Sequence, residues 1–240
     1  MSNLMEPAHK PRYQRLVIGF NHHMECRSVL NFAAQVAQVA EVELAGVFVE
    51  DQELLDLARL PFSTEILSAS GAIRTIDPQR VESDLRGIAL GMREALRKLA
   101  EHAQRRYSFR TVRGRLLHEL IAQAGSSDLI MLRTADFVWR NTKPGLAASS
   151  GPITLLQPAA GENGNLLNLA QGIARSKQQE MVIEKIYEGQ TWLRSLNARL
   201  IIVSAAMFSK GGEDIERFIE AAPCPVLIVP MTGAETAWPL

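Results

Sequence analysis

Short apolar segments flanked by polar residues alternate along the chain with segments whose apolar residues recur every three to four positions. Residues 15–20 predict a buried strand, residues 29–40 an amphipathic helix, and residues 42–49 a second strand. The connections between these three elements are short. A strand, a helix and a strand joined in this way form a βαβ unit, and such units build a parallel sheet.

The same alternation continues to the end of the chain. The strongest helical pattern covers residues 82–105, where apolar side chains form one stripe and charged side chains fill the opposite face. Further helices are predicted at residues 52–59, 116–123, 165–176, 190–196 and 215–222, and further strands at residues 107–113, 128–133, 151–158, 180–187, 199–203 and 224–229. Residues 61–80 predict a long, partly ordered connection, and residues 135–150 a loop. The predicted fold class is α/β, a mainly parallel sheet with helices on both faces.

An internal similarity links the two ends of the chain. Residues 30–33 (Leu-Asn-Phe-Ala) match residues 167–170 (Leu-Asn-Leu-Ala), and Ala37 falls on Ala174, all at one offset of 137 positions. The strands predicted before and after each helix also correspond. Chance similarity between two apolar helices is the alternative, but repeats in a paired βαβ context favour duplication.

We therefore predict two tandem halves, residues 1–150 and an abbreviated half at residues 151–240. The second half has no counterpart of the long connection and helix at residues 61–105. The strand at residues 151–158 could be the last strand of the first half, the first strand of the second, or both.

Composition excludes several classes of protein. Lys and Arg total 26 and Asp and Glu total 26, so the net charge is +0 and neither a nucleic acid nor an anionic membrane is the expected partner. Two cysteines far apart, Cys26 and Cys224, do not suggest a disulfide-stapled secreted domain. Residues 1–15 carry no apolar run typical of a signal peptide. We expect a cytoplasmic protein without membrane spans.

A polar loop after the first strand is a candidate ligand site, because α/β proteins place ligands at the carboxyl ends of their strands. It begins with Asn21 and His22, and residues 22–26 read His-His-Met-Glu-Cys. Neighbouring residues on one loop rarely all face one ion, and no second set with ligand spacing follows. We therefore predict no metal site and favour a solvated loop and helix cap, and a metal-binding module built on His22, His23 and Cys26 is the third alternative for the function of the chain. Contact with a small ligand through Asn21 and His22 is the other interpretation.

Five arginines surround the strand predicted at residues 107–113, namely Arg105, Arg106, Arg110, Arg113 and Arg115. They could form a patch that binds anions or nucleic acid. We favour edge protection, because charged side chains on an edge strand prevent unwanted pairing and the chain is neutral overall.

No pattern typical of nucleophilic catalysis is present. Ser150-Gly151 lacks the Gly-x-Ser-x-Gly elbow, and His118 has no evident Asp or Ser partner. Cys224 lies between two prolines before a buried strand, which favours packing over reactivity. We predict no catalytic residue, no cofactor and no enzyme activity.

The chain resembles the universal stress protein family. The family opens with a strand and a helix of the rhythm Ala-Leu-x-x-Ala, matched by residues 16–21 and 29–33. Its penultimate strand, often Asp-Leu-Ile-Val, is matched by residues 128–131 (Asp-Leu-Ile-Met), and its closing Ala-Pro-Cys-Pro-Val signature by residues 222–226. The resemblance implies a tandem member with a degenerate second half.

Departures from the family pattern concern the phosphate-binding elements. Nucleotide-binding members carry Gly-x2-Gly-x9-Gly-Ser/Thr, because bare backbone amides must contact the phosphates. Residues 135–140 contain bulky side chains and no glycine, and residues 205–214 keep two glycines at other spacing, followed by Glu213 and Asp214. The Asp that ends the family's first strand is Asn21 in one half and Pro158 in the other. The resemblance therefore implies the branch that does not bind ATP.

Two functions follow from the resemblance. The first is a non-enzymatic stress-response or regulatory protein that acts through protein–protein contacts. The second is an adenine-nucleotide sensor with slow or no hydrolysis, whose ligand-binding residues would be Asn21, His22, Val47, Phe48, Val49, Gly114 and Arg133. In that sensor Asn21, residues 47–49 and Gly114 would hold the base and ribose, and Arg133 would replace the glycines at the phosphates. We favour the first. The partner would be another protein or a second copy of the chain, bound through residues 226–229, because an apolar edge strand is a liability if it is left bare. Alternatively, the two halves of one chain pack on each other and cover this strand internally.

Overall fold

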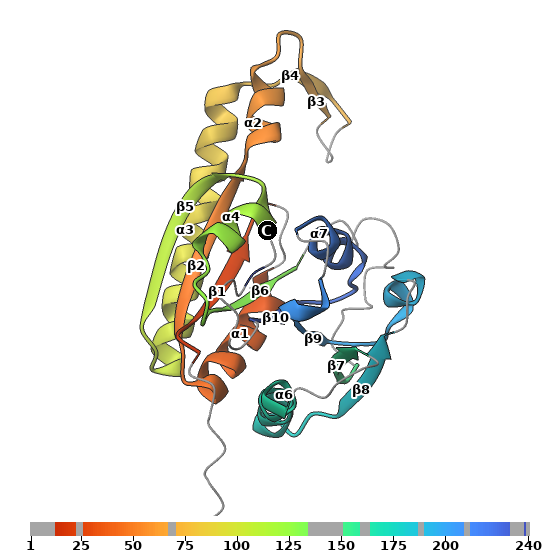
Figure 1. Ribbon diagram of the computed structural model, residues 1–240. Helices are drawn as coiled ribbons and strands as arrows, with labels where there is room; N and C mark the ends of the chain where they lie inside the picture. Colours follow the sequence, from red (N-terminus) through yellow and green to blue (C-terminus); the bar gives the residue numbers. More distant parts are fainter. Residues whose placement is uncertain are drawn as a thin grey trace, which may run out of the picture.

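Eight strands form one sheet in the order β5-β2-β1-β6-β10-β9-β7-β8 (Figure 1). The computed structural model describes residues 13–22, 26–66, 71–133, 151–158, 164–186, 190–208, 212–230 and Trp238. The loop predicted at residues 135–150 lies outside these ranges. The predicted fold class, a mainly parallel α/β sheet, is confirmed by the pairing of these strands.

The sheet consists of two parallel blocks. The first block contains β1 (Arg15–Phe20), β2 (Glu43–Asp51), β5 (Tyr107–Gly114) and β6 (Leu129–Leu132). The second block contains β7 (Ile153–Pro158), β8 (Met181–Ile186), β9 (Leu200–Ser204) and β10 (Val226–Val229). The two blocks meet at an antiparallel pair, β6 with β10.

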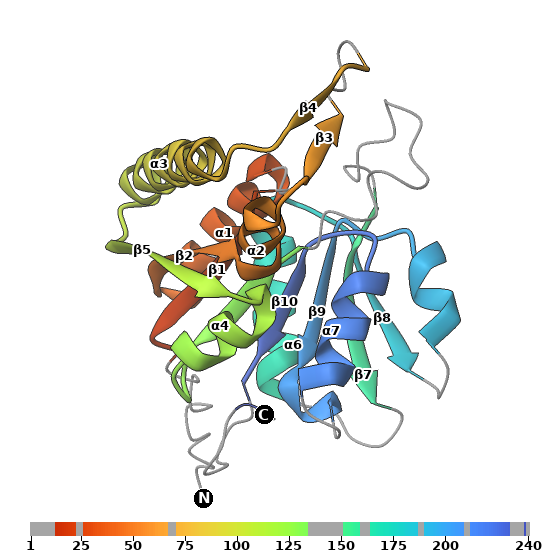
Figure 2. The same ribbon diagram turned by 90° about the horizontal axis from the view of Figure 1, so that it is seen from above.

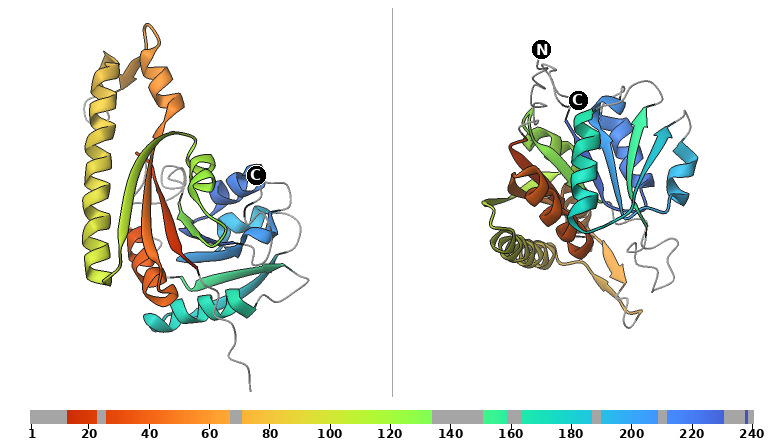
Figure 3. Two further views of the ribbon diagram at one scale, coloured as in Figure 1. Left: turned by 60° about the vertical axis from the view of Figure 1, so that its left-hand side comes forward. Right: turned by 90° about the horizontal axis from the view of Figure 1, so that it is seen from below.

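Helices cover both faces of the sheet (Figures 2 and 3). The structure contains α1 (Cys26–Ala40), α2 (Gln52–Arg59), α3 (Pro78–Ala103), α4 (Leu116–Gln123), α6 (Gly164–Ser176) and α7 (Gly212–Ala221), with short 3-10 helices at Gln190–Ser195 and Ala205–Met207. Residues of α1, α3 and α6 share one buried core, and residues of α4 and α7 share the other. Helix α3 begins earlier than the apolar pattern predicts, because Asp77 caps it and Pro78 occupies its first turn.

Successive strand residues alternate between the two cores. In β9, Leu200 and Ile202 belong to the core under α1, whereas Ile201 and Val203 belong to the core under α4. Both faces are therefore apolar, as expected for a sheet covered by helices on both sides. Trp238 closes the second core, and its indole Nε1–H donates to the carbonyl of Gly125 at 3.0 Å.

The two blocks share a register. Leu16 of β1 lies opposite Leu44 of β2, and Ile153 of β7 lies opposite Met181 of β8. Each residue of the second pair follows its counterpart in the first pair by 137 positions. On the other side, β6 pairs with β1 as β9 pairs with β7, because Leu16 lies opposite Leu129 and Ile153 lies opposite Leu200. Strand β7 therefore holds the place in the second block that β1 holds in the first.

Two features of the sheet differ from what the sequence analysis favoured. Residues 226–229 were expected at an edge that pairs with a second copy or is covered within the chain, and the second alternative is observed, because β10 pairs with β6 on one side and β9 on the other. Residues 61–80 were expected as a connection, but they contain an antiparallel hairpin of β3 (Thr64–Ile66) and β4 (Ile73–Thr75). No helix among the described residues is long and apolar enough to cross a bilayer.

Gly151 is required by a close backbone approach at the start of β7. A Cβ at this position would lie 2.9 Å from the Cα and the N of Ala198, and backbone atoms cannot move aside as a side chain can. We expect Gly151→Ala to lower the free energy of unfolding by about 2 kcal/mol, measured by urea denaturation. The control is Gly87→Ala on α3, where a Cβ meets nothing within 4 Å. That variant should gain about 0.5–1 kcal/mol, because alanine is the better helix former. Equal effects at both positions would contradict the prediction.

Candidate functional site

The carboxyl ends of β1, β2, β5 and β6 lie at one edge of the first block, which we term the carboxyl edge. Asn21 and His22 follow β1, Gly114 ends β5, and Arg133 follows β6. Adjacent strands are about 4.8 Å apart, so Gly114 and Arg133, with two strands between them, are separated by roughly 14 Å. The structure therefore brings these residues to one edge, but only Asn21 and Arg133 are on neighbouring strands.

Three residues assigned to ligand binding from the sequence are buried in the sheet. Val47, Phe48 and Val49 are at most 1% exposed, and their side chains belong to the two apolar cores. Only their backbone could reach a ligand. Their role in nucleotide binding stays a prediction.

Carboxylates at the carboxyl edge are already engaged. Glu50 is 8% exposed, and the Nε of Arg113 donates to its Oε2 at 2.8 Å, which raises the pKa of Arg113. Asp51 caps α2 by accepting the N–H groups of Glu53 and Leu54. The charge of Glu50 is thus compensated by Arg113, and the same pair engages this guanidinium, which would otherwise attract a phosphate group.

The end of β5 is similarly crowded. Gly114 has a φ of +148°, and a Cβ there would lie 2.6 Å from Oε1 of Glu119. The next residue, Arg115, donates to Glu216 of α7 at 2.9 Å. A third and a fourth carboxylate therefore stand near the position that the sequence assigned to the base and ribose.

Arg133 and Cys224 meet at the junction between the two blocks. Arg133 is 9% exposed, and β6 and β10 pair Leu132 with Val226. Burial raises the pKa of the Cys224 thiol to about 12, although the charge of Arg133 and a backbone hydrogen bond with Ile201 act in the opposite direction. A thiol that stays protonated at neutral pH is not a nucleophile.

The loop after β1 is only partly described. His23, Met24 and Glu25 lie outside the described residues, as does the side chain of Cys26. Within the ranges that the structure describes, no group of three His, Cys, Asp or Glu residues is arranged to hold a metal ion. The interpretation of this loop as a cap or as a ligand contact stays a prediction.

Four of the five arginines around β5 have side-chain partners on neighbouring elements. Strand β5 is an edge strand, as the sequence analysis expected. Arg106 pairs with Glu43 at 3.5 Å, and Arg110 donates to the side chain of Gln123. Together with the Arg113 and Arg115 pairs, these contacts give three of the five arginines a carboxylate partner, which agrees with edge protection.

Sequence reasoning missed a groove of about 420 Å³ between α3 and β5. It is lined by Glu50, Arg86, Ala89, Leu90, Arg93, Phe109, Arg110 and Thr111. Arg86 and Arg93 lie seven positions apart on α3, so they share a face of the helix, and this spacing is the signal that could have located the groove. Three guanidinium groups and one carboxylate around an apolar floor can hold an anionic group, but offer no general base other than the ion-paired Glu50.

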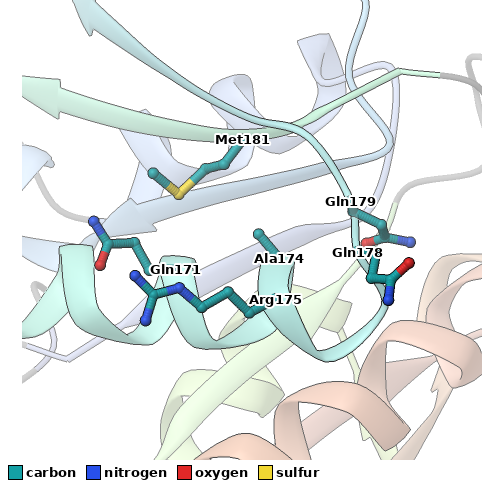
Figure 4. A pocket seen from close by; sticks show the side chains of 6 residues that line it. All are labelled: Gln171, Ala174, Arg175, Gln178, Gln179 and Met181. Atoms are coloured by element: carbon teal, nitrogen blue, oxygen red, sulfur yellow. The ribbon is translucent and has the colours of Figure 1, made fainter.

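A second pocket of about 390 Å³ lies beside the end of α6 (Figure 4). Its lining consists of Gln171, Ala174, Arg175, Gln178, Gln179 and Met181. Three amides and one guanidinium supply hydrogen bonds without an acid–base pair. Neither this pocket nor the groove therefore contains the paired groups that acid–base chemistry needs.

Comparison with models of known protein families and with curated proteins finds no match. Among solved structures, a universal stress protein from Archaeoglobus fulgidus aligns over 90% of this chain and 96% of its own, with 12% identity and a TM-score of 0.45. A protein of the universal stress protein family from Burkholderia pseudomallei aligns over 94% and 100%, with 14% identity and a TM-score of 0.33.

Proposed function

We propose that the chain is a non-enzymatic, cytoplasmic regulatory or stress-response protein of the universal stress protein type, which acts through protein–protein contacts. One observation carries the proposal: the carboxyl edge of the first block is occupied by ion-paired and capping carboxylates. The Glu50–Arg113 pair is the clearest of them. Carboxylates at this edge join neighbouring elements through ion pairs and helix caps, an arrangement that does not favour phosphate binding. The sequence also has no glycine pattern of the phosphate-binding kind.

The tandem arrangement is part of the proposal. It is supported by the shared register of β1-β2 and β7-β8 at the offset of 137 residues. The placement of α1 and α6 in one core agrees with it, because their matching segments show the same offset. The second block has no strand equivalent to β5 among its described residues, which is consistent with an abbreviated second half.

We expect the melting temperature of the protein to be unchanged by 5 mM ATP or AMP with magnesium. A ligand at 100 times its Kd would add about 2.7 kcal/mol to the free energy of unfolding. For a chain of this size that would raise Tm by roughly 5–10 °C. Differential scanning fluorimetry, with equilibrium dialysis against labelled ATP as an independent readout, makes the comparison.

A rise of this size would contradict the proposal and favour the adenine-nucleotide sensor. Arg133→Ala would then test whether the nucleotide binds at the carboxyl edge, since Arg133 is the residue expected to contact the phosphates in the sensor. Loss of the thermal shift in that variant would support phosphate contact at Arg133.

A further inference from the structure

An arm extends beyond the end of β2 (Figures 1 and 3). It carries an unusual amount of exposed apolar surface. The arm consists of the last turn of α2, the turn that follows, and the β3–β4 hairpin. Its large exposed side chains are Leu57 (50%), Leu60 (58%), Phe62 (93%), Ile66 (72%) and Ile73 (69%). Elsewhere in the described ranges the large exposed apolar side chains are Leu90 and Ile183 alone. Apolar residues concentrated in this way mark an interaction surface.

Phe62 is held outward by a hydrogen-bonded turn. The Oγ of Ser63 donates to the carbonyl of Leu57 at 2.8 Å, and the N–H of Ser63 donates to the carbonyl of Leu60 at 3.3 Å. Phe62 adopts a φ of +71°, a conformation that is costly for a bulky residue. Because its ring is almost fully exposed, burial within the chain does not offset this strain. Strain of this kind is typical of functional positions.

The hairpin presents a face that is the same on both strands. Thr64 lies opposite Thr75, and Ile66 lies opposite Ile73, so two identical pairs share one face. The Glu65–Arg74 pair lies on the other face, since side chains alternate along a strand. This face therefore has the same residue types on both strands. A two-fold homodimer contact uses the same patch on both copies, and a face with this internal symmetry fits such a contact.

The charges around the arm are neutralised within the chain. Arg59 pairs with Glu82 at 3.1 Å, and Arg74 pairs with Glu65. Arg80 lies 3.6 Å from Glu65 and 3.7 Å from Asp84, so these three arginines are matched by three carboxylates. Such paired charges favour neither an acidic nor a basic partner. A second copy therefore meets an apolar patch like its own and no like-charge repulsion.

We propose that two copies of this chain associate arm to arm, with the Ile66–Ile73 face and Phe62 at the centre of the contact. The five exposed side chains offer roughly 600 Å² of apolar surface per copy, close to the ~800 Å² that each partner contributes to a standard interface. The contact also packs the apolar face of the two-stranded hairpin, which such a small sheet needs for stability. This contact rests on the proposed function in that it identifies the protein–protein contact through which the chain acts.

Sedimentation velocity between 1 and 100 µM tests the proposal on the full-length chain. We expect a reversible dimer whose Kd rises at least tenfold in Ile73→Thr and in Phe62→Asn. Threonine keeps the β-branched shape of isoleucine, and asparagine tolerates positive φ, so both variants should fold. Phe62→Asn should raise the Tm of the monomer while it weakens the dimer, a combination that general misfolding would not produce.

The matched control is Ile183→Thr, the same substitution at an exposed isoleucine on β8, an edge strand of the eight-stranded sheet and not part of the arm. It should leave the Kd unchanged. A wild-type chain that stays monomeric at 100 µM would overturn the arm contact, as would dimers that tolerate both arm variants or that are lost in Ile183→Thr. None of these results bears on the nucleotide melt, so failure of the arm contact and failure of the proposed function are separate outcomes.

Discussion

Replacing Asp128 with alanine is expected to lower the free energy of unfolding by about 3 kcal/mol. The Asp128 side chain is 1% exposed, and its Oδ2 accepts from the Nε of Arg15 at 3.1 Å and from the N–H of Gly125 at 2.8 Å. The carboxylate thereby joins the start of β1 to the turn before β6. Alanine would leave a half-buried guanidinium without its counter-charge and a backbone N–H without its acceptor. Because the Arg15 side chain is one-third exposed, water compensates part of the loss.

Urea denaturation of Asp128→Ala measures this effect, and Glu101→Ala is the control. Glu101 also pairs with an arginine, Arg97, but its side chain is 61% exposed, so its loss should cost less than about 0.5 kcal/mol. A double-mutant cycle with Arg15→Met isolates the ion pair from the hydrogen bond to Gly125. A loss at Asp128 no larger than that at Glu101 would contradict the assigned role.

The apolar pattern was sufficient to predict most elements of this fold. Strand β1, helix α2 and helix α4 have the predicted bounds, because each combines a clear apolar period with polar ends. The β3–β4 hairpin was missed, since strands of three residues are too short to show a period and lie among Pro, Ser and Gly. The hairpin also buries no apolar face of its own in this chain, so no pattern of burial could indicate it.

Contacts between distant segments were beyond the reach of the sequence pattern. An apolar segment such as β10 predicts a buried strand, but not that its neighbour would be β6, almost 100 residues earlier. The carboxyl edge is similar, because Glu50 and Arg113 are 63 positions apart and are joined only by the pairing of β2 with β5. The sequence located Asn21, Gly114 and Arg133 at this edge because strand ends can be predicted. It could not predict which charges would meet there.

Raising the pH from 8 to 11 is expected to destabilise the protein through Cys224. Burial raises the pKa of this thiol from 9.0 to about 12 in the folded chain. A proton held more tightly in the folded state stabilises it fully below pH 9, and this stabilisation is lost as the pH rises from 9 toward 12, because the unfolded chain ionises first. Three pKa units correspond to at most about 4 kcal/mol, and about 3 kcal/mol of this is lost by pH 11.

The free energy of unfolding, measured at pH 8 and pH 11 under reducing conditions, should therefore fall more in a Cys26→Ala background than in Cys26→Ala/Cys224→Ala. Other groups, including Tyr13, whose pKa burial raises to about 12, titrate in both proteins and cancel in the comparison. Cys224→Ala itself leaves a small cavity and lowers stability at both pH values. The comparison is therefore between the two proteins' decreases in the free energy of unfolding from pH 8 to pH 11. An equal fall in both proteins would mean that the Cys224 thiolate is tolerated between the blocks, with Arg133 as its counter-ion. That outcome would reopen the case for a reactive cysteine at the junction of β6 and β10.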